Sequence, residues 1–134
     1  MFLTKECDYG IRIIRALADG QKKSVEIICE LEYIPNKFAY KIIRKLHHAG
    51  FVRSLRGRDG GYKLVKSLDS FTIYDIVSAI DNNLLVFGCL KSDNNCPHKG
   101  TESDKFCPVH LEYDRIQKIL DSEMQLKTIS DIMM

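Results

Sequence analysis

Apolar residues recur at helical spacing along the first half of the chain and predict three helices in succession. Thr4 is placed to cap the first helix, and Asp19-Gly20 ends it. Positions three and four residues apart share one face of a helix, so this helix is expected to bury one stripe. Its expected buried positions are Gly10, Ile13, Ile14 and Leu17.

A short second helix is predicted over residues 25–32. Ser24 suits its amino-terminal cap. Val25, Ile28 and Leu31 are expected to face inward. Cys29 is interpreted as a small core residue rather than a ligand.

The third helix follows at once, with Pro35 suited to its first turn and Gly50 to its carboxyl-terminal end. Its expected buried stripe is Ala39, Ile42, Ile43 and Leu46. The opposite face is basic, amide-bearing and aromatic, and consists of Asn36, Lys37, Tyr40, Lys41, Arg44 and Lys45. Two closely connected helices, the second with such a face, indicate a helix-turn-helix that reads the major groove of DNA.

Residues 51–55 and 62–65 predict two strands, joined by a glycine-rich turn at residues 57–61. Arg53, Arg56 and Arg58 lie on or beside this turn. Slim backbone with cations suits a minor groove or the phosphate backbone, and we assign Arg56 and Arg58 to that contact. The hairpin alone could be an ordinary solvated turn, but after a helix-turn-helix it predicts a winged helix.

The second half of the chain predicts a fourth helix, a polar segment and a long last helix. Thr72 and Asp75 resemble a capping box for a helix that runs to about Ile80, and Pro108 suits the start of the long helix. A similar capping pattern at residues 127–132 predicts a short final turn. The long helix has a narrow apolar seam, typical of pairing with another helix, although packing against its own domain is the alternative. The seam is Val109, Tyr113, Ile116, Leu120 and Met124.

Between the fourth and the long helix lies a polar segment with the pattern C-x₆-C-x₁₀-C-x₂-H, made by Cys89, Cys96, Cys107 and His110. Three thiols and an imidazole could order such a loop by binding a metal or an iron–sulfur cluster, and the spacing alone does not separate zinc from a cluster. Cys-Pro, which also occurs beside cluster ligands, is present twice. The alternative is a loop with free thiols, or with one disulfide and a spare thiol. The start of the chain does not resemble a signal peptide, so we expect a cytoplasmic protein, where metal binding is favoured over disulfides.

Composition adds a charge asymmetry to this pattern. The chain has 134 residues, 45% of them hydrophobic, which suffices for one domain with a real core, and no stretch is apolar enough to span a membrane. The net charge is +2, but residues 1–66 contain 14 Lys and Arg against 7 Asp and Glu, whereas residues 67–134 contain 6 against 11. A basic first half is typical of a protein that binds a polyanion. No arrangement of residues typical of an enzyme active site is present.

Several stretches match one known family almost from end to end. They are Leu3-Thr4-Lys5 with Asp8-Tyr9, the run from Lys45-Leu46 to Ala49-Gly50-Phe51-Val52, Arg56-Gly57-Arg58-Asp59-Gly60-Gly61-Tyr62-Lys63-Leu64, residues 73–81 and the cysteines with Cys107-x-x-His110. The chain thereby resembles the Rrf-two (Rrf2) family of winged-helix transcription regulators, with its IscR-like and NsrR-like branches. The resemblance implies DNA binding by the third helix and the wing, a homodimer formed through the long helix, and a cluster on the three cysteines.

The resemblance offers two candidates for the fourth ligand. The histidine of the IscR-like branch corresponds to His110, and the aspartate that the partner subunit supplies in the NsrR-like branch corresponds to Asp8. Local spacing favours His110, because it follows Cys107 by one helical turn. The cysteine spacings are longer than the family's commoner ones, so the resemblance leaves open whether the cluster would be [2Fe–2S] or [4Fe–4S].

We therefore expect a mainly α fold with three parts. Residues 1–80 are a winged helix-turn-helix domain, residues 81–107 a cluster-binding loop, and residues 108–134 a dimerisation helix and tail. The expected function is that of a homodimeric regulator of a double-stranded DNA operator, most simply a repressor, with a cluster that senses iron, redox state or nitric oxide. The alternatives are a winged-helix regulator with a structural Cys₃His zinc site and, last, a small electron carrier.

Overall fold

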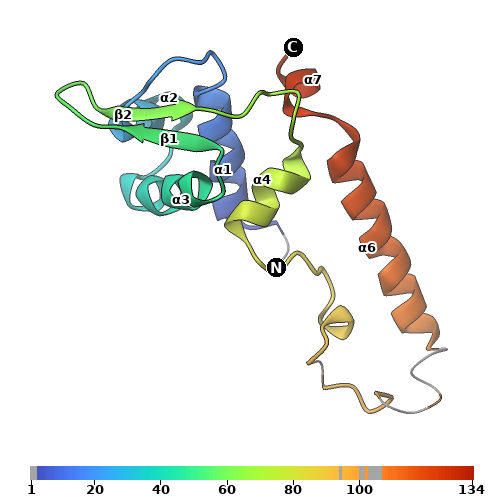
Figure 1. Cartoon of the computed structure of the whole chain (residues 1–134). Coiled ribbons are helices and arrows are strands. Elements are labelled where there is room, and N and C mark those ends of the chain that lie inside the picture. The colour runs from blue at the N-terminus through green and yellow to red at the C-terminus, as the bar shows by residue number, and fades with distance from the viewer. Residues whose placement is uncertain (1–2, 94, 100–101, 103–106) are drawn as a thin grey trace.

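The computed structural model describes residues 3–93, 95–99, 102 and 107–134 (Figure 1). Its elements are α1 (Lys5–Ala16), α2 (Val25–Glu32), α3 (Asn36–His48), β1 (Val52–Leu55), β2 (Gly61–Leu64), α4 (Ile73–Ile80), a 3₁₀ helix η1 (Gly88–Leu90), α6 (Pro108–Leu126) and α7 (Ile129–Met133). The fold is mainly helical, with one antiparallel hairpin, and the predicted winged helix-turn-helix is confirmed. Parts of the predicted cysteine loop, at residues 94, 100–101 and 103–106, lie outside the described residues.

The core forms around α1, which contacts α2, α3 and α4. All four expected positions of the first helix and all four of the third are buried, so both predicted stripes are confirmed. Gly10 leaves room for part of this packing. A Cβ at Gly10 would overlap Cδ1 of Ile80 but lie at an ordinary contact distance of 3.6 Å from Cγ2 of Ile42, so the missing side chain lets Ile80 of α4 pack directly on α1.

The predicted inward face of α2 is wrong at one position. Leu31 is 55% exposed, whereas Cys29, as expected, and Glu32 are buried. Glu32 is buried because the Arg15 guanidinium of α1 donates to its carboxylate, with Nε 3.0 Å and 3.1 Å from the two oxygens. This hydrogen bonding raises the pKa of Arg15 further. The charged residue Glu32, and not Leu31 as helical periodicity predicted, therefore faces inward at the end of α2.

Side-chain caps begin the helices where the sequence placed them. The Thr4 and Ser24 hydroxyls accept from the amides of Cys7 and Ile27. Full capping boxes start α4 and α7, because Thr72 and Thr128 each exchange hydrogen bonds with the aspartate three residues later. The last helix returns to the core, where Ile129 is fully buried and its amide donates to Phe71 O at 2.9 Å.

The hairpin is fixed to the segment that precedes α2. Lys23 forms an isolated antiparallel bridge with Tyr62, with N···O distances of 3.0 Å and 2.8 Å between the two backbones. A Cβ at Gly61 would lie 2.5 Å from Lys23 O. The second strand begins at Gly61, one residue earlier than predicted, because Gly61 pairs with Leu55 of β1, and its missing side chain leaves room for Lys23 O.

Helix α6 extends away from the core along one side of the molecule, and the cysteine segment lies at its far end (Figure 1). Within its 19 residues, all of which the structure describes, only Gln117 is buried. The helix contacts α4 and η1. Among the described helices, none is long and apolar enough to cross a membrane.

Candidate nucleic-acid interface and cysteine site

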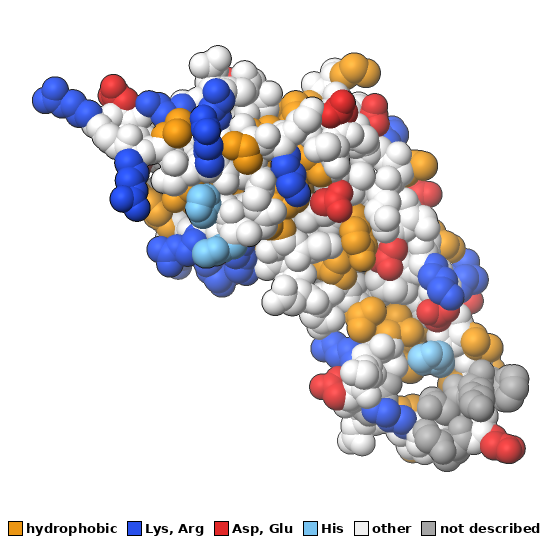
Figure 2. Space-filling model, in the orientation of Figure 1, with side chains coloured by type: hydrophobic (Ala, Val, Ile, Leu, Met, Phe, Trp, Pro, Cys, Tyr) orange, Lys and Arg blue, Asp and Glu red, His pale blue; other side chains and the backbone are white. Residues whose placement is uncertain are grey.

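One face of α3 is exposed and polar. The five residues assigned to DNA contact on this helix, all exposed, are Asn36, Lys37, Tyr40, Lys41 and Arg44. Figure 2 shows Lys and Arg side chains gathered over the wing and α3, at the opposite end of the molecule from the cysteine segment. Arg44 has no ion-pair partner among the described residues, so its guanidinium is available to an external anion.

The hydroxyl of Tyr40 donates to Glu26 Oε1 of α2 at 2.6 Å. This hydrogen bond raises the pKa of Tyr40 and lowers the pKa of the Glu26 carboxyl. This hydrogen bond restrains the Tyr40 side chain on the exposed face. A carboxylate beside this ring would also repel a phosphate that approached from the side of α2.

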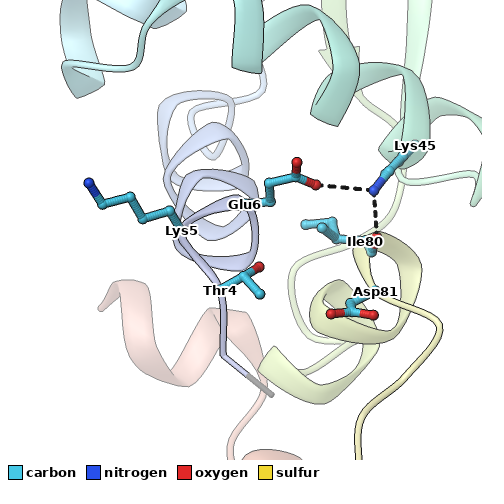
Figure 3. Close-up of a pocket in the computed structure, with 6 residues that line it drawn as sticks. All are labelled: Thr4, Lys5, Glu6, Lys45, Ile80 and Asp81. Carbon is cyan, nitrogen blue, oxygen red and sulfur yellow. Dashed lines mark hydrogen bonds and ion pairs between the residues drawn. The ribbon is translucent and has the colours of Figure 1, made fainter. Parts of the chain in front are cut away.

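Two lysines on the next turns of α3 are tied back to the core. Lys41 Nζ lies 2.7 Å from one oxygen of Glu6, and Lys45 Nζ lies 3.2 Å from the other. Lys45 also donates to Ile80 O at 2.8 Å, at the carboxyl-terminal end of α4 (Figure 3). The hydrogen bond from Lys41 is the main reason that the pKa of Glu6 is lowered, with Lys45 adding to it against the opposing effect of burial. Glu6 of α1 therefore pairs with two lysines of the candidate recognition helix, and one of them, Lys45, also connects that helix to α4.

The hairpin is basic on both strands. Arg53 of β1 faces Lys63 of β2 in the register, and like charges directly opposite each other are unfavourable. Arg56 and Arg58 are exposed at the tip, where Gly57 has a φ of 123° that favours glycine. The described part of the chain provides no ion-pair partner for any of these four cations. The wing therefore presents these four positive charges without an ion pair, against the single carboxylate of Asp59 in its turn.

The structure brings two of the predicted metal ligands together. Cys89 lies in η1, and its Sγ is 3.2 Å from Nδ1 of His110 on the first turns of α6. Cys89 and Cys96 line the same hollow, together with Gly88, Lys91, Asp93, Asn95 and Pro97. Cys107 is the amino-terminal cap of α6, one turn before His110. All three thiols are half-buried.

The described residues do not bring three His, Cys, Asp or Glu side chains into one metal-binding group. Asp8, the other predicted ligand, lies on α1 and pairs with Arg12 at 3.0 Å. Cys7 and Cys29 are buried in the core, and burial is the main reason that the pKa of Cys29 is raised. No disulfide joins any of the five cysteines, all of which belong to the described part of the chain.

The predicted seam of α6 lies partly against its own chain. Tyr113, Ile116, Leu120 and Met124 are half-buried, and Tyr113 stacks on Phe87 with 3.8 Å between ring centroids and an interplanar angle of 5°. Val109, the first seam residue, is 55% exposed. Further apolar residues are exposed elsewhere on the helix, namely Leu111, Ile119 and Leu126.

Sequence reasoning missed Gln117, which is the buried residue of α6 and contacts the segment before Cys89. It also missed that Glu6 engages the lysines of α3. The sequence contains no local signal for either role. Gln117 interrupts the apolar pattern without a motif around it, and Glu6 is 35 residues from Lys41.

A helix-turn-helix with a polar recognition face, followed by a basic hairpin, defines a winged-helix protein. The described chain also brings the Cys89 thiol and the His110 imidazole into contact at the end of α6 that lies away from the core. The chain belongs to the Rrf2 family, whose family model, described as an iron-dependent transcriptional regulator, matches residues 3–134. It is thus related to transcriptional regulators and not to enzymes.

Two relatives support this assignment. A protein of Rhizobium meliloti (strain 1021) named aau3 is 30% identical over 100 residues, which make up 72% of this chain and 65% of that protein. A protein of Aquifex aeolicus (strain VF5), named as an HTH-type transcriptional regulator, is 31% identical over 118 residues, or 87% of this chain and 79% of that protein.

Solved structures show the same fold at lower identity. CymR of B. subtilis, described as its global cysteine regulator, has a TM-score of 0.70 at 22% identity and covers 99% of this chain and 96% of its own. The oxidized form of Staphylococcus aureus CymR has a TM-score of 0.73 at 18% identity, with the same coverage. IscR of T. potens has a TM-score of 0.70 at 21% identity, covering 98% of this chain and 85% of its own.

The link through Glu6 predicts a specific dependence of stability on pH. Because folding lowers the pKa of Glu6, its ionised form stabilises the folded protein above the usual glutamate range, and this stabilisation is lost as the pH falls through the lowered pKa. Glu6→Gln should lower the free energy of unfolding by about 1 kcal/mol above about pH 5, and the difference should shrink in acid. Urea denaturation at several pH values measures it.

Glu112→Gln is the matched control, because Glu112 pairs with Arg115 on the exposed surface of α6. Solvent screens such a pair, so its loss should change stability much less. A Glu6→Gln difference that stays constant from neutral pH into acid would contradict the assignment.

Proposed function

We propose that the chain is a homodimeric, cytoplasmic repressor whose attachment to an operator is controlled by an iron–sulfur cluster. The observation that carries this proposal is the 3.2 Å contact between Cys89 Sγ and His110 Nδ1, beside the hollow that Cys89 shares with Cys96. The contact between this thiol and this imidazole supports the proposal that both bind one metal. Membership of the Rrf2 family supplies the regulatory context.

The donor set fits an iron–sulfur cluster. Cys89, Cys96 and Cys107 would bind it through their thiolates, and His110 would be the fourth ligand within the same chain. Asp8 would serve only if supplied by the partner subunit, as the resemblance implies, and it would then have to leave its pair with Arg12 on α1. A bound cluster supplies a group that iron supply, redox state or nitric oxide can alter. The same residues would also suit structural zinc. An iron–sulfur cluster is coloured and zinc is not, so visible absorbance distinguishes the two.

The DNA contact is proposed to have two parts. The exposed face of α3, with Tyr40 fixed by Glu26 and Arg44 unpaired within the described chain, would enter the major groove. The tip with Arg56 and Arg58 would lie in the minor groove or against the backbone. The facing charges of Arg53 and Lys63 support this role, because a phosphate between them would relieve their repulsion.

The homodimer is proposed to form through α6. A helix of 19 residues with one buried position leaves apolar area for a partner. The seam from Val109 to Met124 would form the interface together with the more exposed Leu111 and Ile119. Two recognition helices related by a two-fold axis would then read half-sites about 10 bp, or a multiple of that, apart.

Protein purified without oxygen should be brown, and its visible absorbance should identify the ligands. Cys107→Ala should abolish the cluster, because a thiolate ligand is lost. His110→Ala should form a cluster that decays about tenfold faster in air, while Asp8→Ala changes little. The measurement is the decay of visible absorbance after exposure to oxygen.

His98→Ala is a suitable control, because His98 lies in the same segment but outside the proposed ligand set. Colourless protein with one zinc per chain would refute the cluster. Faster decay in Asp8→Ala than in His110→Ala would transfer the fourth ligand to the partner subunit's first helix.

Arg44→Ala and Arg58→Ala should affect DNA binding in different ways. One good base contact is worth about 1–3 kcal/mol of discrimination, so loss of Arg44 should weaken operator binding more than binding to random DNA. Loss of Arg58 should weaken both and flatten the salt dependence, because it removes a contact to phosphate or groove charge. Titration of both DNAs at several salt concentrations measures this. Equal losses on both DNAs for Arg44→Ala would count against base reading.

Glutamate on α6 should dissociate the dimer. The paired change Ile116→Glu with Leu120→Glu should give a monomer by light scattering, with weaker operator binding. Because these residues are half-buried in their own chain, the exposed pair Leu111→Glu with Ile119→Glu serves as a second test with less effect on folding. A dimer that survives both changes would exclude α6 as the interface.

A further inference from the structure

Gln117 is 6% exposed, and both ends of its amide are used. Its Oε1 accepts from the Val86 amide at 2.9 Å, and its Nε2 donates to Leu84 O at 3.0 Å. Nε2 also lies 3.0 Å from Oδ1 of Asp121, one turn further along α6. Because a buried amide without partners is costly, these hydrogen bonds fix the backbone of residues 84–86 to the helix.

The next residue along this segment is fixed as well. Phe87 stacks on Tyr113, which lies one turn before Gln117 on α6. Cys89 follows two residues later, in the short helix η1. Residues 84–87 are thus held by two side chains of α6 immediately before the chain reaches the cysteine.

His110 lies on the same face of α6 as Tyr113 and Gln117. It precedes Gln117 by seven residues, which is two turns, so the two side chains project from the same side of the helix. The helix therefore sets the distance between the fixed backbone at Val86 and the imidazole. At the other end of this spacing, the Cys89 Sγ lies 3.2 Å from the His110 Nδ1.

We propose that Gln117 is a positioning residue for the cysteine site. By binding the backbone of residues 84–86 to α6, it places the Cys89 thiol against His110. The inference rests on the proposed function, in which Cys89 and His110 are ligands of one cluster. It adds a residue outside the ligand set that determines whether two ligands meet.

The competing explanation is that Gln117 only fills space beneath the segment. Methionine is as long and unbranched as glutamine and fills the same space without hydrogen bonds. Gln117→Met therefore separates hydrogen bonding from packing. The control is Gln125→Met, because Gln125 is exposed on the same helix and its amide donates to Asp121 O of that helix, at 3.1 Å.

The first measurement uses reduced protein without metal, so it does not require that a cluster binds. Alkylation of each cysteine is followed by mass spectrometry of its peptide. In Gln117→Met, release of the segment should expose the half-buried Cys89 and raise its alkylation rate by about threefold or more. The rates of Cys96 and Cys107 in the same sample should stay near those of the parent and of Gln125→Met.

The second measurement uses protein loaded with the cluster. Visible circular dichroism should change in Gln117→Met, because the geometry around the metal changes, and the cluster should decay in air about tenfold faster than in Gln125→Met. Gln117→Leu also removes these hydrogen bonds and is apolar and of similar volume, so its values should match those of Gln117→Met. It also serves if Gln117→Met does not fold.

The outcomes separate this inference from the function on which it rests. If the parent binds a cluster but Gln117→Met equals Gln125→Met in alkylation, spectrum and decay, the positioning role is refuted and the cluster stands. If the parent binds no cluster, the proposed function fails, and a selective rise in Cys89 alkylation would still show that Gln117 positions this thiol.

Discussion

Glycine at position 10 lets α1 and α4 pack in direct contact, because any Cβ there would occupy the space of Ile80. This contact lies beside the residues that connect α1, the candidate recognition helix and the start of the cysteine segment. Ile80 ends α4, and its carbonyl accepts from Lys45 of the candidate recognition helix, which also pairs with Glu6 of α1. The chain then leaves α4 toward the cysteine segment. A change in the position of α4 would therefore affect the candidate recognition helix through the ammonium group of Lys45. It would affect the thiols through the backbone that follows Ile80.

The fold could be predicted from local signals in the sequence. The stripes of α1 and α3 and the caps at Thr4, Ser24 and Thr72 each depend on residues within a few positions of one another, where helical spacing and hydrogen-bonding geometry determine the outcome. The inward face of α2 could not be predicted in this way. Glu32 displaces Leu31 from the interior because Arg15, 17 residues earlier, compensates its charge.

The candidate site was only partly accessible from sequence for the same reason. Cysteine and histidine are candidate ligands by residue type alone, so Cys89 and His110 could be predicted from the sequence. The structure places their side chains in contact. What holds them there depends on Gln117, whose amide contacts backbone atoms 31 and 33 residues away. Backbone atoms carry no residue-specific signal, so a side chain that binds them leaves no pattern to read. The family resemblance supplied the expected ligands but not this support.

The facing cations of the hairpin, Arg53 and Lys63, have a consequence for how ionic strength acts on the protein. Mobile ions screen the repulsion between the two side chains and so tighten the hairpin of the free protein. The same ions compete for any phosphate that would sit between them. Salt thus makes the free wing more ordered while it makes the bound wing less favourable. The free wing is therefore most rigid at high salt, whereas it binds DNA best at low salt.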